Sequence, residues 1–193
     1  STPIPLVPLY VGRRMWRVFD LVAPSLHLNS TLGFVNNRPS YPVSVKVDKK
    51  VSAHQIMDIL RDYYEGTPYD QTKGLAAGPF GYPQRWAGTS GKPVEGGWER
   101  TISIYRCSYT FVAQVRLHEK NKALAGVLWY GHDIPSGTVY VPFFGGQNKL
   151  PDSYTKVKQS IFMKGTAWWA FNFINNWAAL MYNQIYPAVR REI

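Results

Sequence analysis

The sequence predicts an α+β protein, in which helices pack against an antiparallel sheet. Four successive runs are rich in β-branched and aromatic residues and are joined by short turn-like segments, as in an antiparallel meander. These runs cover residues 99–108, 109–118, 123–132 and 138–144. Helical patterns stand before and after them. With 193 residues, 45% of them hydrophobic, the chain is long enough for a packed core, and residues 1–193 are expected to form a single domain portion.

A first helix is predicted over residues 13–23, because apolar side chains recur there at helical spacing and Pro24 stops the pattern. These apolar residues are Met15, Val18, Phe19 and Val22. Residues 26–41 have the composition of a loop. The alternation in residues 41–47 predicts a short strand.

A second helix is predicted to begin after Ser52, which forms a capping-box pattern with Gln55. Its apolar stripe comprises Ile56, Ile59, Leu60 and Tyr63. Gly66 is the predicted stop, so the irregular, acidic and aromatic segment that follows should be a loop.

The pattern of apolar residues predicts which surfaces of the sheet and of the C-terminal helix are buried. In the run 109–118, apolar Tyr109, Phe111, Ala113 and Val115 alternate with more polar residues, which predicts that these four form the buried face. From Thr166, a predicted N-cap, the chain is helical and apolar around most of its circumference. We expect this helix to be buried and to be kinked or ended by Pro187.

Charge and cysteine content narrow the function classes. The net charge is +10, but Lys and Arg are scattered rather than gathered in a stripe, so we do not expect nucleic-acid binding. The basic balance fits a more acidic partner. No apolar run is long enough to span a membrane. The single cysteine, Cys107, excludes an internal disulfide and is interpreted as a small hydrophobic residue rather than a nucleophile.

Candidate site residues lie beyond the second helix. Glu65 and Asp70 flank the sequence GTPY, and these carboxylates fit either a substrate amine or a loop-locking ion pair with Arg61 or Arg85. No metal or other cofactor is expected, because the four histidines lack metal-ligand spacing and are interpreted as surface residues. They are His27, His54, His118 and His132.

Two arginines stand at the start of the predicted meander. Arg100 follows a glycine turn, where a guanidinium can bind a carboxylate with two hydrogen bonds. Arg106, six residues further, should point to the same face of a strand.

Several blocks resemble the dipeptidase A family of cysteine hydrolases, which belongs to the N-terminal-nucleophile superfamily. The blocks are ILRDYYEGTPYDQTKGLAAGPFGYPQR, ERTISIYRCSYTFVAQVR, GVLWYG, YVPFFGG, LPDSY and AWWAFNFINNWA. The resemblance implies the C-terminal part of an αββα sandwich, with antiparallel sheets between helical layers, and an enzyme that hydrolyses dipeptides or small amides.

In that family the nucleophile is a cysteine in the N-terminal half, and this chain matches the C-terminal portion. Cys107 is not that cysteine, and the Pro-rich segment after Ser1 does not suit an N-terminal nucleophile. We therefore expect a separate N-terminal chain of the same precursor to carry the catalytic cysteine, and the assembly to be an oligomer. The resemblance implies a catalytic role for Arg100, with Arg106 in reserve, and substrate binding by Glu65, Tyr69 and Asp70.

Two alternatives stay open: an amidase acting on N-acyl compounds, and a non-catalytic binding module of the same fold. The sequence Asn29-Ser30-Thr31 is an N-glycosylation sequon. Together with the expected processing it favours a lysosomal or secretory location, with a cytoplasmic location as the alternative.

Overall fold

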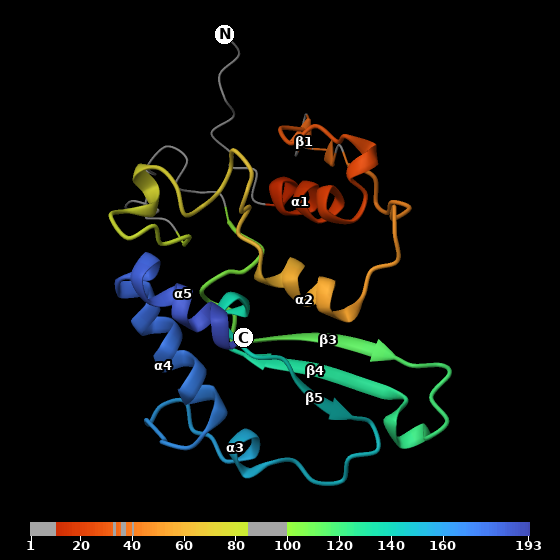
Figure 1. Cartoon of the computed structure of the whole chain (residues 1–193), viewed down its shortest axis with the longest axis vertical. Coiled ribbons are helices and arrows are strands. Elements are labelled where there is room, and N and C mark those ends of the chain that lie inside the picture. The colour runs from red at the N-terminus through yellow and green to blue at the C-terminus, as the bar shows by residue number, and fades with distance from the viewer. Residues whose placement is uncertain (1–10, 33, 36–37, 40, 85–99) are drawn as a thin grey trace. The chain divides into compact units, whose positions relative to one another are not determined.

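The computed structural model describes residues 11–32, 34–35, 38–39, 41–84 and 100–193 (Figure 1). It combines helices with antiparallel sheet, which confirms the predicted α+β class. The chain forms two compact units. Unit 1 comprises Ser1–Ser52 and Asp62–Ile102, and unit 2 comprises Ala53–Arg61 and Ser103–Ile193.

Unit 1 contains one longer helix and much irregular backbone. Helix α1 (Gly12–Val22) and the 3₁₀ turn Pro24–Leu26 confirm the first predicted helix and its stop. The two-residue strands β1 (Phe34–Val35) and β2 (Arg38–Pro39) pair antiparallel, and a second 3₁₀ turn covers Leu75–Ala77. The predicted strand at residues 41–47 is wrong, because this segment is irregular and Val43 is fully exposed.

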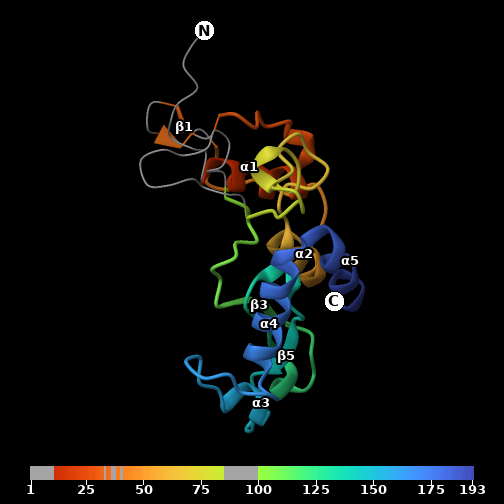
Figure 2. The same cartoon turned by 90° about the vertical axis from the view of Figure 1, so that its left-hand side faces the viewer.

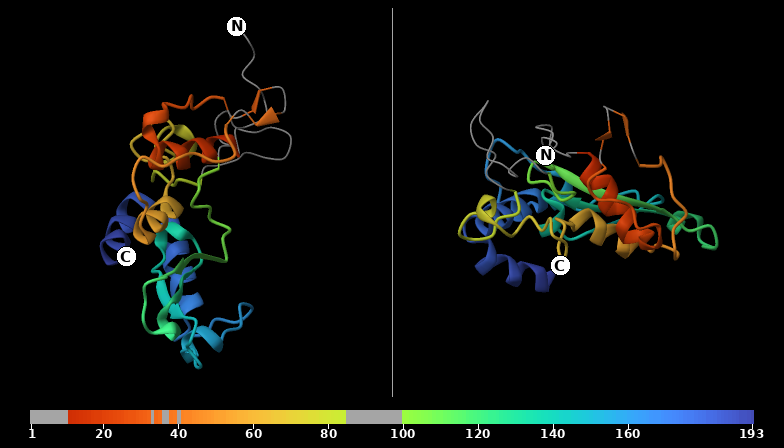
Figure 3. Two further views of the ribbon diagram at one scale, coloured as in Figure 1. Left: turned by 90° about the vertical axis from the view of Figure 1, so that its right-hand side faces the viewer. Right: turned by 90° about the horizontal axis from the view of Figure 1, so that it is seen from above.

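Unit 2 is built around a three-stranded meander. Strands β3 (Tyr109–Val115), β4 (Gly126–His132) and β5 (Val141–Phe144) pair antiparallel in the order β3-β4-β5. Its helices are α2 (Ala53–Arg61), α3 (Asp152–Thr155), α4 (Ala167–Leu180) and α5 (Tyr182–Glu192), with 3₁₀ turns at Lys122–Leu124 and Pro135–Gly137. Helix α4 contacts β4, and it runs beside the sheet in Figures 2 and 3.

The first of the four predicted strands does not form. Residues 100–108 are bends and turns, in which Thr101 and Ser103 are fully buried while Tyr105 and Arg106 are exposed. The buried hydroxyl of Ser103 accepts a hydrogen bond from the backbone N–H of Ser136 at 2.9 Å instead of lying along a ladder. Because there is no strand here, the argument that Arg100 and Arg106 share a face is also wrong.

The sheet buries the face opposite to the one predicted. Its core contains Met57, Val112 and Tyr140, with Ala53, Leu60 and Trp129 packed against them. Tyr109 and Phe111 are instead 55% and 51% exposed. The register places their face together with side chains of β4 and β5. We call this surface the aromatic face; it consists of Tyr109, Phe111, Leu128, Tyr130 and Phe143.

The C-terminal helical segment is two helices rather than one. It begins after Thr166, as predicted, but breaks at Met181, whose φ of −141° and ψ of 63° are not helical. Helix α5 then continues through Pro187, so of the two predicted effects of this proline, a kink or an end, the end does not occur. Burial all around the segment is also wrong, because Phe173 and Trp177 of α4 are 47% and 57% exposed.

Candidate active site

The centre of the candidate site is a buried ion pair in unit 1 between Arg17 of α1 and Asp62. The Arg17 Nε lies 3.1 and 3.0 Å from the two carboxylate oxygens of Asp62, and Nη2 lies 2.8 Å from Oδ2. Both side chains are nearly buried, at 10% and 8% exposure. Burial by itself lowers the pKa of Arg17, but the hydrogen bonds and negative charges of Asp62 and Asp20 outweigh it, and the pKa lies above its ordinary value.

Tyr64 connects this ion pair to Arg100. Its side chain is fully buried, and its φ of 71° is left-handed, which is costly for a non-glycine residue. The Tyr64 N–H donates to Asp62 Oδ1 at 2.8 Å, and its hydroxyl donates to the backbone carbonyl of Arg100 at 2.5 Å. The half-buried Arg100 is therefore held through its own backbone by a residue that the ion pair orients.

The loop after Asp62 is closely packed. Arg17 Nη2 donates to the carbonyl of Glu65 at 2.9 Å, and the N–H of Gln71 donates to the carbonyl of Tyr63 at 3.1 Å. Gln71 is only 2% exposed, and its side-chain amide donates to the carbonyl of Tyr69 at 2.9 Å. The acidic, aromatic loop is thus held by hydrogen bonds along its length, and its Tyr64 contacts the Arg100 backbone.

The three predicted substrate-binding residues all lie in this loop and are half-buried. The Asp70 carboxylate accepts from the N–H and the hydroxyl of Thr72, at 2.9 and 2.6 Å. The ring of Tyr69 lies under the Arg13 guanidinium, 3.4 Å from its carbon, and its hydroxyl bonds the Ser30 hydroxyl at 2.7 Å. Glu65 contributes its backbone carbonyl to Arg17, as described above. The substrate roles of these residues stay predictions.

The ion pair that locks the loop is not one of those considered from the sequence. The sequence suggested Arg61 or Arg85 as the cation, but Arg61 lies 3.5 Å from Asp58 of its own helix, and Arg85 is outside the described residues. Arg17 and Asp62 are separated by 45 residues, so no local spacing could have revealed them.

The other sequence-predicted residues lie elsewhere. Arg106 belongs to unit 2, is exposed, and has its guanidinium carbon 5.8 Å from the centre of the Tyr105 ring. Cys107 is half-buried in a turn of the same segment, and its N–H donates to the carbonyl of Ile104. Asn29 is exposed, and its side-chain oxygen accepts from the N–H and the hydroxyl of Thr31. Ser1 lies outside the described residues.

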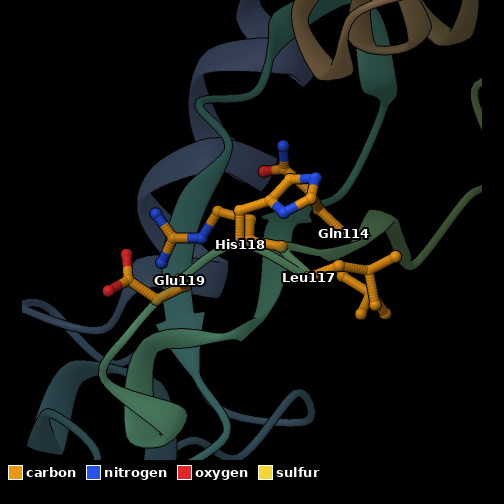
Figure 4. Close-up of a pocket in the computed structure, with 6 residues that line it drawn as sticks. Gln114, Leu117, His118 and Glu119 are labelled. Atoms are coloured by element: carbon orange, nitrogen blue, oxygen red, sulfur yellow. The ribbon is translucent and has the colours of Figure 1, made fainter.

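An open hollow of about 500 Å³ lies at the end of β3 and does not coincide with the candidate site. It is lined by residues 114–119 of unit 2. Figure 4 shows Leu117 and Glu119 pointing to opposite sides of this turn. A hollow formed by one short surface segment offers no convergent polar groups, so we assign it no catalytic role.

Unit 2 contains a second buried polar cluster at the end of β4. Asp133 has a φ of 66°, is 4% exposed, and accepts from the side-chain amides of Asn172 at 3.1 Å and Asn175 at 2.8 Å. The neighbouring His132 is 7% exposed, so the prediction of a surface histidine is wrong here. Burial lowers the pKa of His132, and the charge of Asp133 opposes the shift. Its ring stacks on Tyr154 at 5.1 Å.

Among the described residues, no group of three histidine, cysteine or acidic side chains has the geometry to hold a metal ion. In the same part of the chain, no helix has the length and apolar character needed to cross a bilayer.

Residues 8–193 match the sequence model of peptidase family C69. The chain is 25% identical over 127 residues to a "Probable dipeptidase" of Latilactobacillus sakei, covering 66% of this chain and 23% of the relative. It is 27% identical over 133 residues to a "Probable dipeptidase" of Salmonella dublin, covering 69% and 25% of the two chains. A "Probable dipeptidase A" of Streptococcus pyogenes serotype M1 is 24% identical over 120 residues, covering 62% and 22%.

The chain therefore spans about a quarter of the length of the curated relatives that it matches. The resemblance to the dipeptidase A family, based on the loop and strand blocks, is confirmed by these findings. The match extends over nearly all of the sequence and includes both units. This chain belongs to peptidase family C69.

Proposed function

We propose that this chain is the scaffold and pocket portion of a dipeptidase, whose attacking cysteine is supplied by a separate N-terminal chain of the same precursor. The observation that carries the proposal is the family match over residues 8–193. The relatives' printed names, all of them dipeptidases, indicate the substrate class.

The proposed chemistry is acyl transfer. The sulfur of the N-terminal cysteine attacks the carbonyl carbon of the dipeptide, while the cysteine's own α-amino group takes the thiol proton. The peptide C–N bond then breaks, and the proton passes to the departing amine. Water then attacks the thioester, which releases the N-terminal amino acid of the dipeptide and restores the thiol.

We propose that Arg100 lies beside the reacting carbonyl, where the reaction needs hydrogen-bond donors and a positive charge. A guanidinium presents several N–H donors and a fixed positive charge, and it can stabilise the developing oxyanion or hold the substrate carboxylate. Glu65 and Asp70 place negative charge on the same loop, where they would attract the substrate's α-ammonium group. Tyr69, which lies between these two residues in the sequence, would form an aromatic side of the substrate pocket.

The aromatic face supports the proposed partner chain. Tyr109 stacks on Tyr130 at 5.8 Å and on Phe111 at 6.4 Å. Tyr109 and Phe111 are more than half exposed, whereas Tyr130 and Phe143 are half-buried. In an antiparallel sheet, the face that is exposed to water is normally polar. A large exposed apolar patch therefore marks an interaction site. A second sheet, from the N-terminal chain, would cover this face and complete an αββα sandwich. The net charge of +10 favours an acidic partner.

The test is to purify the protein from its source under native conditions, and to determine the intact mass and N-terminal sequence of every copurifying chain. We expect a companion chain that begins with cysteine, and an assembly that hydrolyses dipeptides such as Gly-Leu faster than N-acyl amino acids. The reverse preference would indicate the amidase instead. Full dipeptidase activity of residues 1–193 alone would refute the proposal, and a folded, inactive chain without a companion would indicate a binding module.

A further inference from the structure

We propose that Tyr64 is a positioning residue that acts through Arg100, by holding the backbone from which the Arg100 side chain leaves. This inference rests on the catalytic role proposed for Arg100. It assigns to the buried part of the loop a function in the reaction itself, and it concerns residues of unit 1 alone.

Tyr64 is fixed at both of its ends. Its N–H is bonded to the Asp62 carboxylate, which is itself held by three contacts from Arg17. Its left-handed φ of 71° is one that a tyrosine adopts only where surrounding contacts impose it. The Tyr64 side chain is fully buried, so the surrounding atoms restrict rotation of the ring. Its hydroxyl donates a hydrogen bond to the Arg100 carbonyl.

A hydrogen bond to that carbonyl restrains the backbone from which the Arg100 side chain leaves. Cβ and the carbonyl carbon are both bonded to the Arg100 Cα, and the next peptide unit is planar, so a restraint on the carbonyl limits the directions that the Cα–Cβ bond can take. The next residue, Thr101, is 1% exposed, and its hydroxyl lies 3.5 Å from Gln84 Nε2 of the same loop. The loop thus holds the backbone carbonyl of Arg100 and the side chain of Thr101, two consecutive residues.

The expected consequence is kinetic. Replacing Tyr64 by phenylalanine keeps the ring and removes the donor, so the Arg100 carbonyl is released without a cavity being created. A displacement near 1 Å at a catalytic group can cost as much as 10²-fold in rate, and we expect kcat/KM to fall about 10- to 100-fold in Tyr64→Phe.

The experiment is a double-mutant cycle with Arg100→Ala in the enzyme assembled with its cysteine-bearing chain. If Tyr64 acts through Arg100, adding Tyr64→Phe to Arg100→Ala should change kcat/KM by no more than about twofold. Tyr41→Phe is the matched control, because Tyr41 is also buried and its hydroxyl also donates to a backbone carbonyl, that of Asn29, at 2.6 Å. It should lower stability to a similar degree and leave turnover unchanged.

A measurement without turnover accompanies the cycle. Amide hydrogen exchange over residues 100–102 should speed up in Tyr64→Phe and stay unchanged in Tyr41→Phe.

The outcomes separate this inference from the proposed function. Unchanged exchange at residues 100–102, or equal rate losses from Tyr64→Phe with and without the Arg100 side chain, would overturn the positioning role while leaving the dipeptidase intact. Full activity of Arg100→Ala would overturn both the role of Arg100 and the inference built on it. Faster exchange together with a non-additive rate loss supports the proposal.

Discussion

Removal of the Asp62 carboxylate is the most informative perturbation of unit 1. In Asp62→Ala the Arg17 guanidinium stays buried without its main counter-charge, and the Tyr64 N–H loses its acceptor. Breaking a buried ion pair by removing one partner typically costs about 3–5 kcal/mol. We expect a loss of that size in the free energy of opening this loop.

The assay is native-state hydrogen exchange at the Gln71 amide, which is bonded within the same loop to the Tyr63 carbonyl. Asp20→Ala is the control, because Asp20 also contacts Arg17, at 3.3 Å, but its side chain is 39% exposed. A partly exposed pair of this kind contributes about 0–1 kcal/mol.

The paired change Arg17→Met with Asp62→Leu should recover part of the loss, because no charge is then left buried. If Asp62→Ala cost no more than Asp20→Ala, the ion pair would not be what holds the loop, and the reasoning about its role in orienting Tyr64 would fail.

Two further predictions concern unit 2. Burial lowers the pKa of His132 in the folded protein. The unfolded chain, with an ordinary histidine pKa near ~6.5, therefore binds the proton more tightly. The free energy of unfolding should be at its full value above about pH 6.5 and should fall as the pH drops below it. His132→Phe should flatten the change in urea midpoint between about pH 7.5 and 5.5, and an unaltered pH profile would count against the buried neutral histidine. In Gly137→Ala the new Cβ would lie 1.8 Å from Oδ1 of Asn175, whose amide is held by Asp133, so we expect about 1–3 kcal/mol of destabilisation by urea unfolding. Gly126→Ala, which meets open space, is the control, and equal effects of the two changes would contradict the packing argument.

The parts of the fold that the sequence predicts are those specified by local pattern. The three strands of the meander and the starts of α1, α2 and α4 follow from runs, spacing and capping residues within a few positions. The run at 99–108 has the composition of a strand, but its Thr101 and Ser103 are buried in irregular backbone, where side-chain hydrogen bonds replace a ladder. Composition cannot distinguish these two ways of satisfying buried polar groups.

The sidedness of the sheet is a different kind of failure. Alternation in β3 shows that its two faces differ, but not which one is covered. In unit 2 the face with Val112 packs on Met57, and the more aromatic face with Tyr109 is exposed. The number of apolar side chains on a face is therefore a poor guide to which face of this sheet is covered.

For the candidate site, the sequence predicted the loop and Arg100 as candidates but not the contacts that hold them. The Arg17–Asp62 pair spans 45 residues, and the hydrogen bond from Tyr64 to the Arg100 carbonyl spans 36. An interaction with a backbone carbonyl leaves no signature in residue type, and long-range ion pairs have no period. Only tertiary structure could show that the loop is organised from α1.

The tight bend at Asp133 has a consequence for the order in which the protein is made. Its carboxylate is held by amides that lie 39 and 42 positions further along the chain, on α4. The ribosome makes β3 and β4 before that helix, so until α4 is made the Asp133 carboxylate of the nascent hairpin lacks these two hydrogen-bond donors, and they do not stabilise its costly backbone conformation. The end of the β3–β4 hairpin would then become stable only when α4 packs against it. A stalled or shortened translation product that lacks α4 should therefore be a good substrate for chaperones and proteases.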